Sequence, residues 1–319
     1  MGFENNNGGK VETSSFMRDF IDKCGGYAVH LDYLDAGANI IITASYQATI
    51  EGFEAKGYSR EEAESALRRS VQVACEARQI YKDRCTKYSS HFITNNNATY
   101  IKRPILVAAS VGSYGAYLAD GSEYRGDYGE QVTVDTLKDF HRGRLRILAD
   151  SAPDLIAFET IPNKLEAMAY AELLEEEGIE IPAWFSFSCK DEGSVVSGDS
   201  ILECASIADT CKKVAAIGVN CTAPKYVQTL IASISKVTTK PVLVYPNSGE
   251  TYDGESKQWE KSSGVGEEEE DFVSYISKWR DAGASLFGGC CRTTPYTIRS
   301  ITKALSGKCS VADNRCYIE

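Results

Sequence analysis

Seven short apolar runs alternate with amphipathic segments along most of this chain, and this alternation restricts the possible folds more than any other feature. Each run is apolar throughout rather than at every second residue, as expected for strands buried on both faces of a sheet. A repeated strand–helix order without a break in composition predicts an α/β fold with a parallel sheet. The runs are residues 38–47, 104–112, 153–162, 182–189, 215–224, 241–249 and 284–291.

The segments between these runs have the sequence pattern of helices. Ser59 and Glu62 have the spacing of a capping box, which predicts a helix from there to about residue 85. Residues 134–150 place leucines and a phenylalanine on one helical face. Further helices are expected near 163–177, 200–213, 224–236, 269–282 and 295–305.

A doubly wound sheet and a (β/α)8 barrel of the TIM type both consist of such strand–helix units. The ends of the runs favour the barrel, because nearly every run finishes in polar residues and a barrel gathers all strand ends at one face, where sites are built. No glycine-rich phosphate loop follows the first run, which argues against a dinucleotide-binding fold. We therefore predict a barrel domain over residues 25–306, between a polar N-terminal segment (1–24) and a C-terminal tail (307–319).

The first strand–helix unit of this predicted barrel is short. Seven runs are clear where a barrel needs eight, and residues 25–29 (GGYAV) are the candidate for a stub of the missing first strand. Residues 30–38 provide barely two helical turns, whereas a crossover between parallel strands needs a dozen or more residues. The sequence thus predicts a truncated first βα unit.

Charge and composition exclude several classes of function. The chain of 319 residues has a net charge of −11, which argues against nucleic-acid binding because phosphates require a basic face. No apolar run approaches the roughly 20 residues that a membrane helix needs. The first residues lack the basic and apolar regions of a signal peptide, so we expect a cytoplasmic protein. Its 11 cysteines are then buried fillers or metal ligands rather than disulfides.

Three of these cysteines stand at the ends of two predicted strands. Cys290 and Cys291 are adjacent at the end of the last run, and Cys221 ends the run at 215–224. In a barrel these strands are two apart, so their ends converge, and three thiolates with an open fourth position are typical of a catalytic zinc site. Adjacent cysteines also form redox pairs, and a cysteine on a buried strand is often simple packing.

Other polar residues at strand ends complete the candidate site. Glu159 ends an apolar run, where a carboxylate is rarely placed without a partner. Loop 113–129 contains four tyrosines, which either surround a cation or pack against one another. The remaining candidates for the same site are Ser45, Tyr46, Gln47, Asn220 and Asn247, the two asparagines as hydrogen-bonding supports or as turn residues.

The segments GVNCTAP (218–224) and GGCCRTTP (288–295) resemble the homocysteine S-methyltransferase family, in particular the plant enzymes that use S-methylmethionine. The resemblance extends over about 30–306 and includes AFETIPN (157–163) and YPNSGE (245–250). It implies a (β/α)8 barrel with a zinc ion held by three cysteines. It also implies methyl transfer from S-methylmethionine or S-adenosylmethionine to homocysteine, forming methionine. The residues that it assigns are Cys221, Cys290 and Cys291 to zinc and Glu159 to the amino group of homocysteine.

The chain departs from this family at its first strand. Family members end that strand in an Asp-Gly-Gly-type motif, whereas here residues 24–29 lead directly into 30–38, as after an internal deletion or alternative splicing. We therefore expect weak or absent methyl transfer compared with a full-length relative. Two alternatives follow: a catalytically impaired remnant that binds zinc or thiols, and a dithiol redox protein that uses Cys290 and Cys291.

Overall fold

The computed structural model describes residues 26–92, 103–249, 251–253, 258–260, 272–306 and 316–317, without the side chains of 88–92, 251–253, 258–260, 272–273 and 316–317. The predicted N-terminal segment and most of the predicted tail therefore lie outside the described residues. Within them, no helix is both long enough and apolar enough to cross a membrane.

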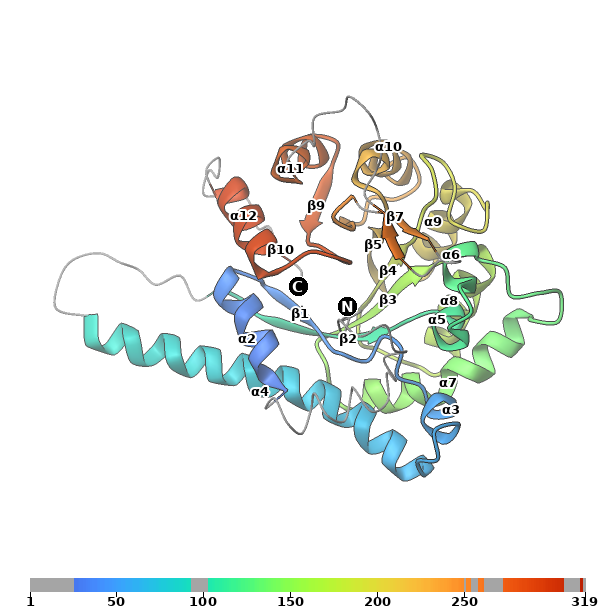
Figure 1. Ribbon diagram of the computed structural model, residues 1–319, viewed down its shortest axis with the longest axis horizontal. Coiled ribbons are helices and arrows are strands. Elements are labelled where there is room, and N and C mark those ends of the chain that lie inside the picture. The colour runs from blue at the N-terminus through green and yellow to red at the C-terminus, as the bar shows by residue number, and fades with distance from the viewer. Residues whose placement is uncertain are drawn as a thin grey trace.

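A curled parallel sheet forms the centre of the molecule, with helices around its outer face (Figure 1). All seven predicted apolar runs contribute a strand to it, in chain order, which confirms the α/β class. These strands are β1 (Ile40–Ile42), β2 (Leu106–Val111), β3 (Leu155–Ile161), β4 (Ala183–Phe187), β5 (Val214–Asn220), β6 (Val242–Tyr245) and β9 (Ala284–Phe287).

The sheet has the form of a half-barrel rather than a closed ring. A two-residue strand near the end of the chain, β10 (Cys316–Tyr317), pairs in parallel with β9 beyond the predicted barrel domain. Within the described part of the chain no strand joins β10 to β1. A separate antiparallel pair, β7 (Thr251–Asp253) and β8 (Gln258–Glu260), follows β6 and was not predicted.

The segment before β1 differs from the prediction. Gly26 forms a turn with a φ of 36°, and helix α2 (Tyr27–Ala36) begins directly after it, so residues 27–29 of the expected strand stub are helical. The stub prediction was wrong because Leu31 and Leu34, three residues apart, are both buried on one side of a continuous helix.

The outer helices match the predicted positions closely, although the first long one extends further than expected. Ser59 and Glu62 form the predicted capping box, with reciprocal bonds of 2.9 and 3.2 Å between backbone N–H and side-chain oxygen. The long helices are α4 (Arg60–Phe92), α7 (Val134–Asp150), α8 (Lys164–Glu176), α9 (Ile201–Thr210), α10 (Pro224–Ile234), α11 (Phe272–Asp281) and α12 (Pro295–Ser306), and the short ones are α3 (Ile50–Glu54), α5 (Tyr114–Leu118) and α6 (Ser122–Arg125).

Helices α2 and α12 are in contact, although they come from opposite ends of the described chain. Gly37 caps α2 with a φ of 116°, and a Cβ atom built there would lie 2.6 Å from Thr302 Oγ1 on α12. A side chain is therefore excluded at this position both by conformation and by space. The contact between α12 and α2 therefore makes the layer of helices continuous on the side where the sheet is open.

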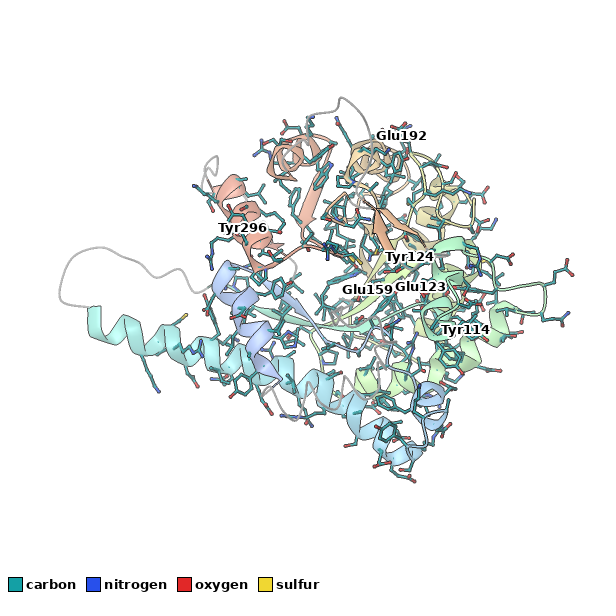
Figure 2. The ribbon with its side chains drawn as sticks, viewed as in Figure 1. Tyr114, Glu123, Tyr124, Glu159, Glu192 and Tyr296 are labelled. Carbon is teal, nitrogen blue, oxygen red and sulfur yellow. The ribbon has the colours of Figure 1, made fainter. Side chains whose placement is uncertain are left out.

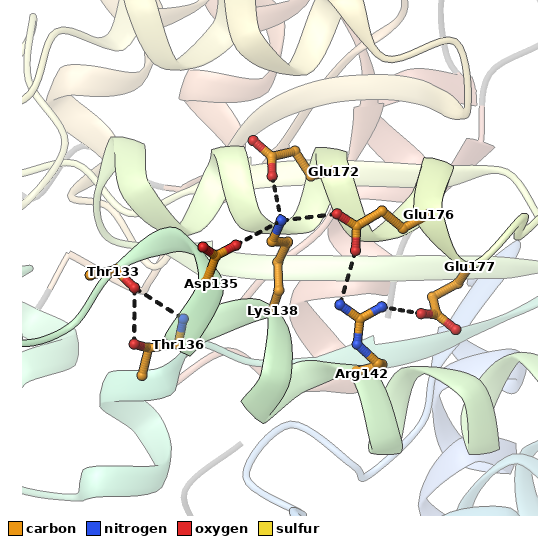
Figure 3. A network of polar contacts seen from close by, with 8 residues as sticks. All are labelled: Thr133, Asp135, Thr136, Lys138, Arg142, Glu172, Glu176 and Glu177. Carbon is orange, nitrogen blue, oxygen red and sulfur yellow. Dashed lines mark hydrogen bonds and ion pairs between the residues drawn. The ribbon is translucent and has the colours of Figure 1, made fainter.

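Helices α7 and α8 are joined at the surface by a network of charged side chains (Figure 3). The Lys138 ammonium is central to it and lies 2.7 Å from a Glu172 oxygen and 2.9 Å from a Glu176 oxygen. Side-chain ion pairs of this kind fix the register of two helices that pack side by side. The network's charged members are Asp135, Lys138, Arg142, Glu172, Glu176 and Glu177.

The concave side of the sheet carries a small apolar cluster distinct from the larger core under the helices. Small side chains such as Ala108 and Ala157 leave room there for Trp184 and Tyr245, whose rings pack edge to face. The Trp184 Nε1–H donates to the Tyr245 hydroxyl over 3.1 Å. This packing holds the tyrosine hydroxyl at the carboxyl end of the strands, where the candidate site lies.

Candidate metal centre and its surroundings

The three cysteines singled out from the sequence meet at the carboxyl ends of β5 and β9, on either side of β6. The Cys221 and Cys291 sulfurs are 3.4 Å apart, the Cys290 and Cys291 sulfurs 3.9 Å, and all three lie within 4.8 Å of one another. Zinc–sulfur bonds of about 2.3 Å in a tetrahedron place two sulfurs about 3.8 Å apart. The donor set and its spacing therefore fit a zinc ion with one position left open.

Backbone contacts between neighbouring strands fix this arrangement. The Cys221 N–H donates to the Tyr245 carbonyl oxygen (3.3 Å), and the Cys290 N–H donates to the Pro246 carbonyl oxygen (2.8 Å). A Cβ atom at Gly289 would lie 2.3 Å from Thr293 Oγ1, so only glycine fits in the turn that presents the adjacent cysteines. Both turns thus depend on the end of β6.

The three thiols share their protons unequally. Hydrogen bonds from Cys221 and Cys290 lower the pKa of Cys291 to about 3, because its sulfur accepts from both neighbours. The hydrogen bonds with Cys290 and Cys291, together with burial, raise the pKa of Cys221 well above its usual value. Cys291 is therefore the thiol of the cluster that loses its proton most readily, and metal binding has to displace the protons of the other two.

Asn220 supports the cluster from the last position of β5. Its Nδ2 donates to Cys290 Sγ over 3.9 Å and to Thr160 Oγ1 over 2.8 Å, while its Oδ1 accepts from the Thr160 N–H and from the Ser186 hydroxyl. The side chain is fully buried and its amide is satisfied on both sides. Asn220 therefore orients a candidate ligand.

Glu159 lies near the thiols on β3 and is only 8% exposed. Its carboxylate accepts hydrogen bonds from the Ser110 hydroxyl and from the Tyr245 hydroxyl. Burial raises the pKa of this carboxyl to about 7, and the charge of Cys290 acts in the same direction. Among the described residues Glu159 forms no ion pair, so its carboxylate is available to a cationic group.

The residues that follow β1 divide into two roles. The Ser45 hydroxyl is fully buried and donates to the Ser110 carbonyl oxygen over 2.8 Å, and Gln47 Nε2 donates to the Ala116 carbonyl oxygen over 3.4 Å. These contacts attach the loop after β1 to the segment after β2. Tyr46 hydrogen-bonds Thr160 and lies close enough to Cys221 for the cysteine's charge to act on its hydroxyl.

Asn247 has the geometry of a turn residue. Its Oδ1 accepts from the Gly249 N–H over 3.2 Å, and its own N–H donates to the Thr222 carbonyl oxygen over 3.3 Å. Contacts of this kind stabilise the chain reversal after β6. The second contact also links this turn to Thr222, the residue that follows Cys221.

Comparison with known proteins places this site in a family. The model of the family "Homocysteine S-methyltransferase" matches residues 27–305, most of the chain. The chain belongs to the homocysteine S-methyltransferase family. It is 61% identical to Homocysteine S-methyltransferase 3 of Arabidopsis thaliana over 339 aligned positions, which cover 95% of this chain and 96% of the relative. It is 62% identical to Selenocysteine Se-methyltransferase of Brassica oleracea, over 89% of this chain and 80% of that one.

The same family appears among solved structures. The homocysteine methyltransferase MmuM of Escherichia coli, in a form described as metallated, has 35% sequence identity and a TM-score of 0.73, covering 93% of this chain and 90% of the bacterial one. An oxidized form of the same protein gives a TM-score of 0.75. These findings confirm the family that the cysteine motifs predicted.

The tyrosine-rich loop of this homocysteine S-methyltransferase family member has two parts. The rings of Tyr114, Tyr117 and Tyr128 lie against one another or against Phe140, which is the self-packed arrangement. Tyr124 is different, because its side chain lies beside Glu123 (Figure 2) and close enough to Tyr46 to act electrostatically on that hydroxyl.

Sequence reasoning missed Glu123, the neighbour of Tyr124 on α6. It is 9% exposed, and burial raises the pKa of its carboxyl to about 7. Its charge acts on Cys291 and on Tyr46, so it lies within electrostatic reach of the thiol cluster. The available signal was an acidic residue beside an aromatic one in a glycine-bounded loop at the strand-end face.

Proposed function

We propose that this chain is a zinc-dependent methyltransferase that moves a methyl group from S-methylmethionine, or from S-adenosylmethionine, to homocysteine and forms methionine. The observation that carries the proposal is the convergence of three cysteine sulfurs, spaced for a tetrahedral zinc ion, in a member of this family. The names of the curated relatives support homocysteine as the acceptor.

The zinc ligands in this proposal are Cys221, Cys290 and Cys291, and no other group of at least three histidine, cysteine or acidic side chains in the described part of the chain could hold a metal. When bound, zinc would keep the sulfur of homocysteine as a thiolate near neutral pH. Asn220, through its contact with Cys290, would set the orientation and basicity of that ligand.

The substrate contacts come from the chain's own polar side chains. Glu159 pairs with the ammonium group of homocysteine. The Ser110 and Tyr245 hydroxyls hold the Glu159 carboxylate in place. Tyr46 lines the same space. Three further residues support the site through hydrogen bonds to the backbone: Ser45, Gln47 and Asn247.

The proposed reaction requires the two substrates to be positioned, and its methyl-transfer step involves no proton transfer. The sulfur of homocysteine forms a bond to the methyl carbon, the carbon–sulfur bond of the sulfonium donor breaks, and its electron pair remains on the departing sulfur as a neutral thioether. No general base is needed in this step. The protein's contribution is to align the two sulfurs and the methyl group and to exclude competing orientations.

A second acceptor, selenocysteine, is also supported. Relatives named for selenocysteine methylation are as similar to this chain, at 62% identity, as those named for homocysteine. Both acceptors carry a nucleophilic chalcogen and an ammonium group, so the same contacts serve either. Measuring both acceptors with one donor under identical conditions gives the preference.

We further propose that the first βα unit is truncated and that activity is thereby reduced. The alignment with the Arabidopsis relative runs over 339 positions, more than the 319 residues of this chain, so at least 20 of them face gaps here. The lack of a described strand between β10 and β1 agrees with a missing unit. The dithiol alternative gains no support, because Cys291 lies nearer to Cys221 than to Cys290.

The test is metal analysis combined with methyl transfer on the purified chain. We expect one zinc per chain and methionine formation from S-methylmethionine and homocysteine that is slower than in a full-length relative. Cys221→Ser and Cys291→Ser should lose both, while Cys75→Ser, on α4, should lose neither. Methionine formation that persists after complete removal of zinc, or none in a zinc-loaded sample even with the first unit of the Arabidopsis relative inserted before Tyr27, would refute the proposal.

A further inference from the structure

Glu123 is a buried carboxylate that the chemistry described above does not use. It lies on the four-residue helix α6, between Gly121 and Gly126, and only 9% of it is exposed. Its carboxylate is hydrogen-bonded by the Tyr124 side chain, and the nearest like charge is Asp120. Among the described residues, Glu123 forms no ion pair.

An unpaired buried carboxylate is costly, because the charge leaves water without gaining an opposite charge. Proteins usually place a cation beside such a group. Here the described part of the chain supplies none, and the carboxylate lies within electrostatic reach of the thiols. Without such a partner the pKa of Glu123 is raised by burial, and a cationic ligand beside the group would keep it charged.

The two buried carboxylates of the site lie at different thiols. Glu159 acts electrostatically on Cys290, whereas Glu123 acts on Cys291 and on the Tyr46 ring. Figure 2 shows both side chains toward the centre of the half-barrel, with Tyr124 beside Glu123. Methyl transfer between two sulfurs needs two substrates at one centre, and in the proposed reaction both substrates carry a cationic group.

The backbone around Glu123 is held firmly by the protein. A Cβ atom at Gly115 would lie 2.5 Å from the Glu123 backbone nitrogen, so helix α5 packs closely on the start of α6. The Tyr114 N–H donates to a Glu166 oxygen over 2.7 Å, and the Tyr128 hydroxyl donates to the same carboxylate. The loop is thus anchored on both sides of α6, and Glu123 is positioned before a ligand arrives.

We propose that Glu123 is the anionic wall of the methyl-donor subsite and pairs with the sulfonium group of the donor, with the Tyr46 and Tyr124 rings beside it. This inference rests on the proposed function and assigns one carboxylate to each substrate. The pairing has a direct consequence for turnover. Once the methyl group has left, the donor sulfur is neutral, so the product loses the attraction that held the substrate.

The experiment compares donor binding in the wild type and in Glu123→Gln, both loaded with zinc. The probes are S-methylmethionine and its neutral isostere, in which carbon replaces the sulfonium sulfur, measured by titration calorimetry. The positive sulfur donates no hydrogen bond, so its preference over the isostere reports charge attraction alone, which we expect to be about 10- to 100-fold in the wild type. Glu123→Gln should bind the two probes equally.

Controls separate this inference from the proposed function. Glu192→Gln, an exposed carboxylate at the rim, should behave as the wild type (Figure 2). Zinc content and homocysteine binding should be unchanged in Glu123→Gln. These two measurements also show that the variant is folded. Glu123→Asp, which keeps the charge on a shorter side chain, should show an intermediate preference.

Two results would overturn the assignment while leaving the proposed function intact. One is an unchanged sulfonium preference in Glu123→Gln, and the other is an equal loss of affinity for both probes. If the wild type binds homocysteine but does not bind S-methylmethionine, both the inference and the proposed donor fail. In steady-state kinetics, the expected signature is a raised KM for the donor with kcat little changed, because the carboxylate faces positive charge both in the bound donor and in the transition state.

Discussion

Three residues around the thiol cluster have a left-handed backbone although none is glycine. Thr160, Cys221 and Arg292 have φ values of 57°, 50° and 64°. Such conformations cost on the order of 1 kcal/mol or more each and persist where the surrounding structure enforces them. Here the Asn220 side chain holds that of Thr160, because its amide binds both the backbone N–H and the hydroxyl of this residue.

At the residue scale, the first prediction concerns Asn220. Replacing it with alanine removes the donor to Cys290 Sγ, and we expect zinc affinity to fall about 10- to 100-fold, as for other groups that orient metal ligands. Competition with a chromophoric chelator measures this.

Ser186→Ala is the matched control for Asn220→Ala, because it removes a hydroxyl partner of the Asn220 amide oxygen without touching the sulfur. It should retain most of the zinc affinity. Equal losses in the two variants would show that the contact with sulfur is not the cause.

A second prediction at this scale concerns the pH dependence of homocysteine binding. The pKa of Glu159 is raised to about 7 in the folded protein, mainly by burial. Below that pH the carboxyl is protonated and cannot pair with an ammonium, so affinity should fall as pH falls through about 7. Calorimetric titrations of the zinc-loaded protein between pH 6 and 8 would follow this.

The comparison that isolates Glu159 uses an acceptor analogue without the amino group. Its binding should lack the step near pH 7, and Glu159→Gln should remove the step for homocysteine itself. A step of the same size in Glu159→Gln would assign it to another group.

The sequence predicted the residues of the thiol cluster better than those around it. Cys221, Cys290 and Cys291 could be predicted because their motifs are local and their strand ends converge in any parallel barrel. Glu123 could not, because its burial depends on the packing of α5 against α6, which no local pattern reports.

At the scale of elements, helices α7 and α8 share a buried polar network beneath their surface ion pairs. His141 is fully buried; its Nε2 donates to Glu166 Oε1 over 2.7 Å, and its Nδ1 accepts from Arg144 Nη2 over 2.7 Å. The same Glu166 carboxylate holds Tyr128 and the backbone of Tyr114. The pair of helices therefore supports the loop that carries Glu123.

The prediction at this scale is a loss of stability in mild acid. Burial and the charge of Arg144 lower the pKa of His141 to about 4, against 6.5 for the unshifted group. Between these pH values the unfolded state binds a proton that the folded state does not. The free energy of unfolding should therefore fall as pH falls from 6.5 to 4, by on the order of 3 kcal/mol at most.

Urea unfolding at several pH values measures this loss. His141→Asn should be less stable at neutral pH but should show a smaller decline over the same range. An equally steep decline in that variant would attribute the effect to carboxyl groups elsewhere.

The elements also show where a sequence pattern was ambiguous. Residues 25–29 contain two glycines before apolar residues, which suits the start of a strand as well as a turn before a helix. Tertiary packing decided between them, since the apolar residues of α2 continue at helical spacing onto the neighbouring helices. The seven longer runs were not ambiguous, because each is flanked by helical segments.

At the scale of the whole molecule, the proposed zinc ion would connect the ends of β5 and β9. A metal bound only by the folded state stabilises it by about 4 kcal/mol when its concentration is 1,000 times its dissociation constant. Removal of zinc by a strong chelator should therefore lower the Tm by several degrees or more. Calorimetry with and without chelator measures this, and Cys221→Ser should show no chelator effect. An unchanged Tm in the wild type would contradict a zinc site in this position.

The ligands of the proposed centre are also far apart along the chain, since Cys221 and Cys291 are separated by 70 residues. During synthesis, Cys221 leaves the ribosome long before its two partners do. The three-sulfur site cannot exist until β9 has been made and has paired with β6. Metal uptake at this site is therefore a late event that follows completion of the domain, and a chain cut short before β9 would carry only one of the three cysteines of the site.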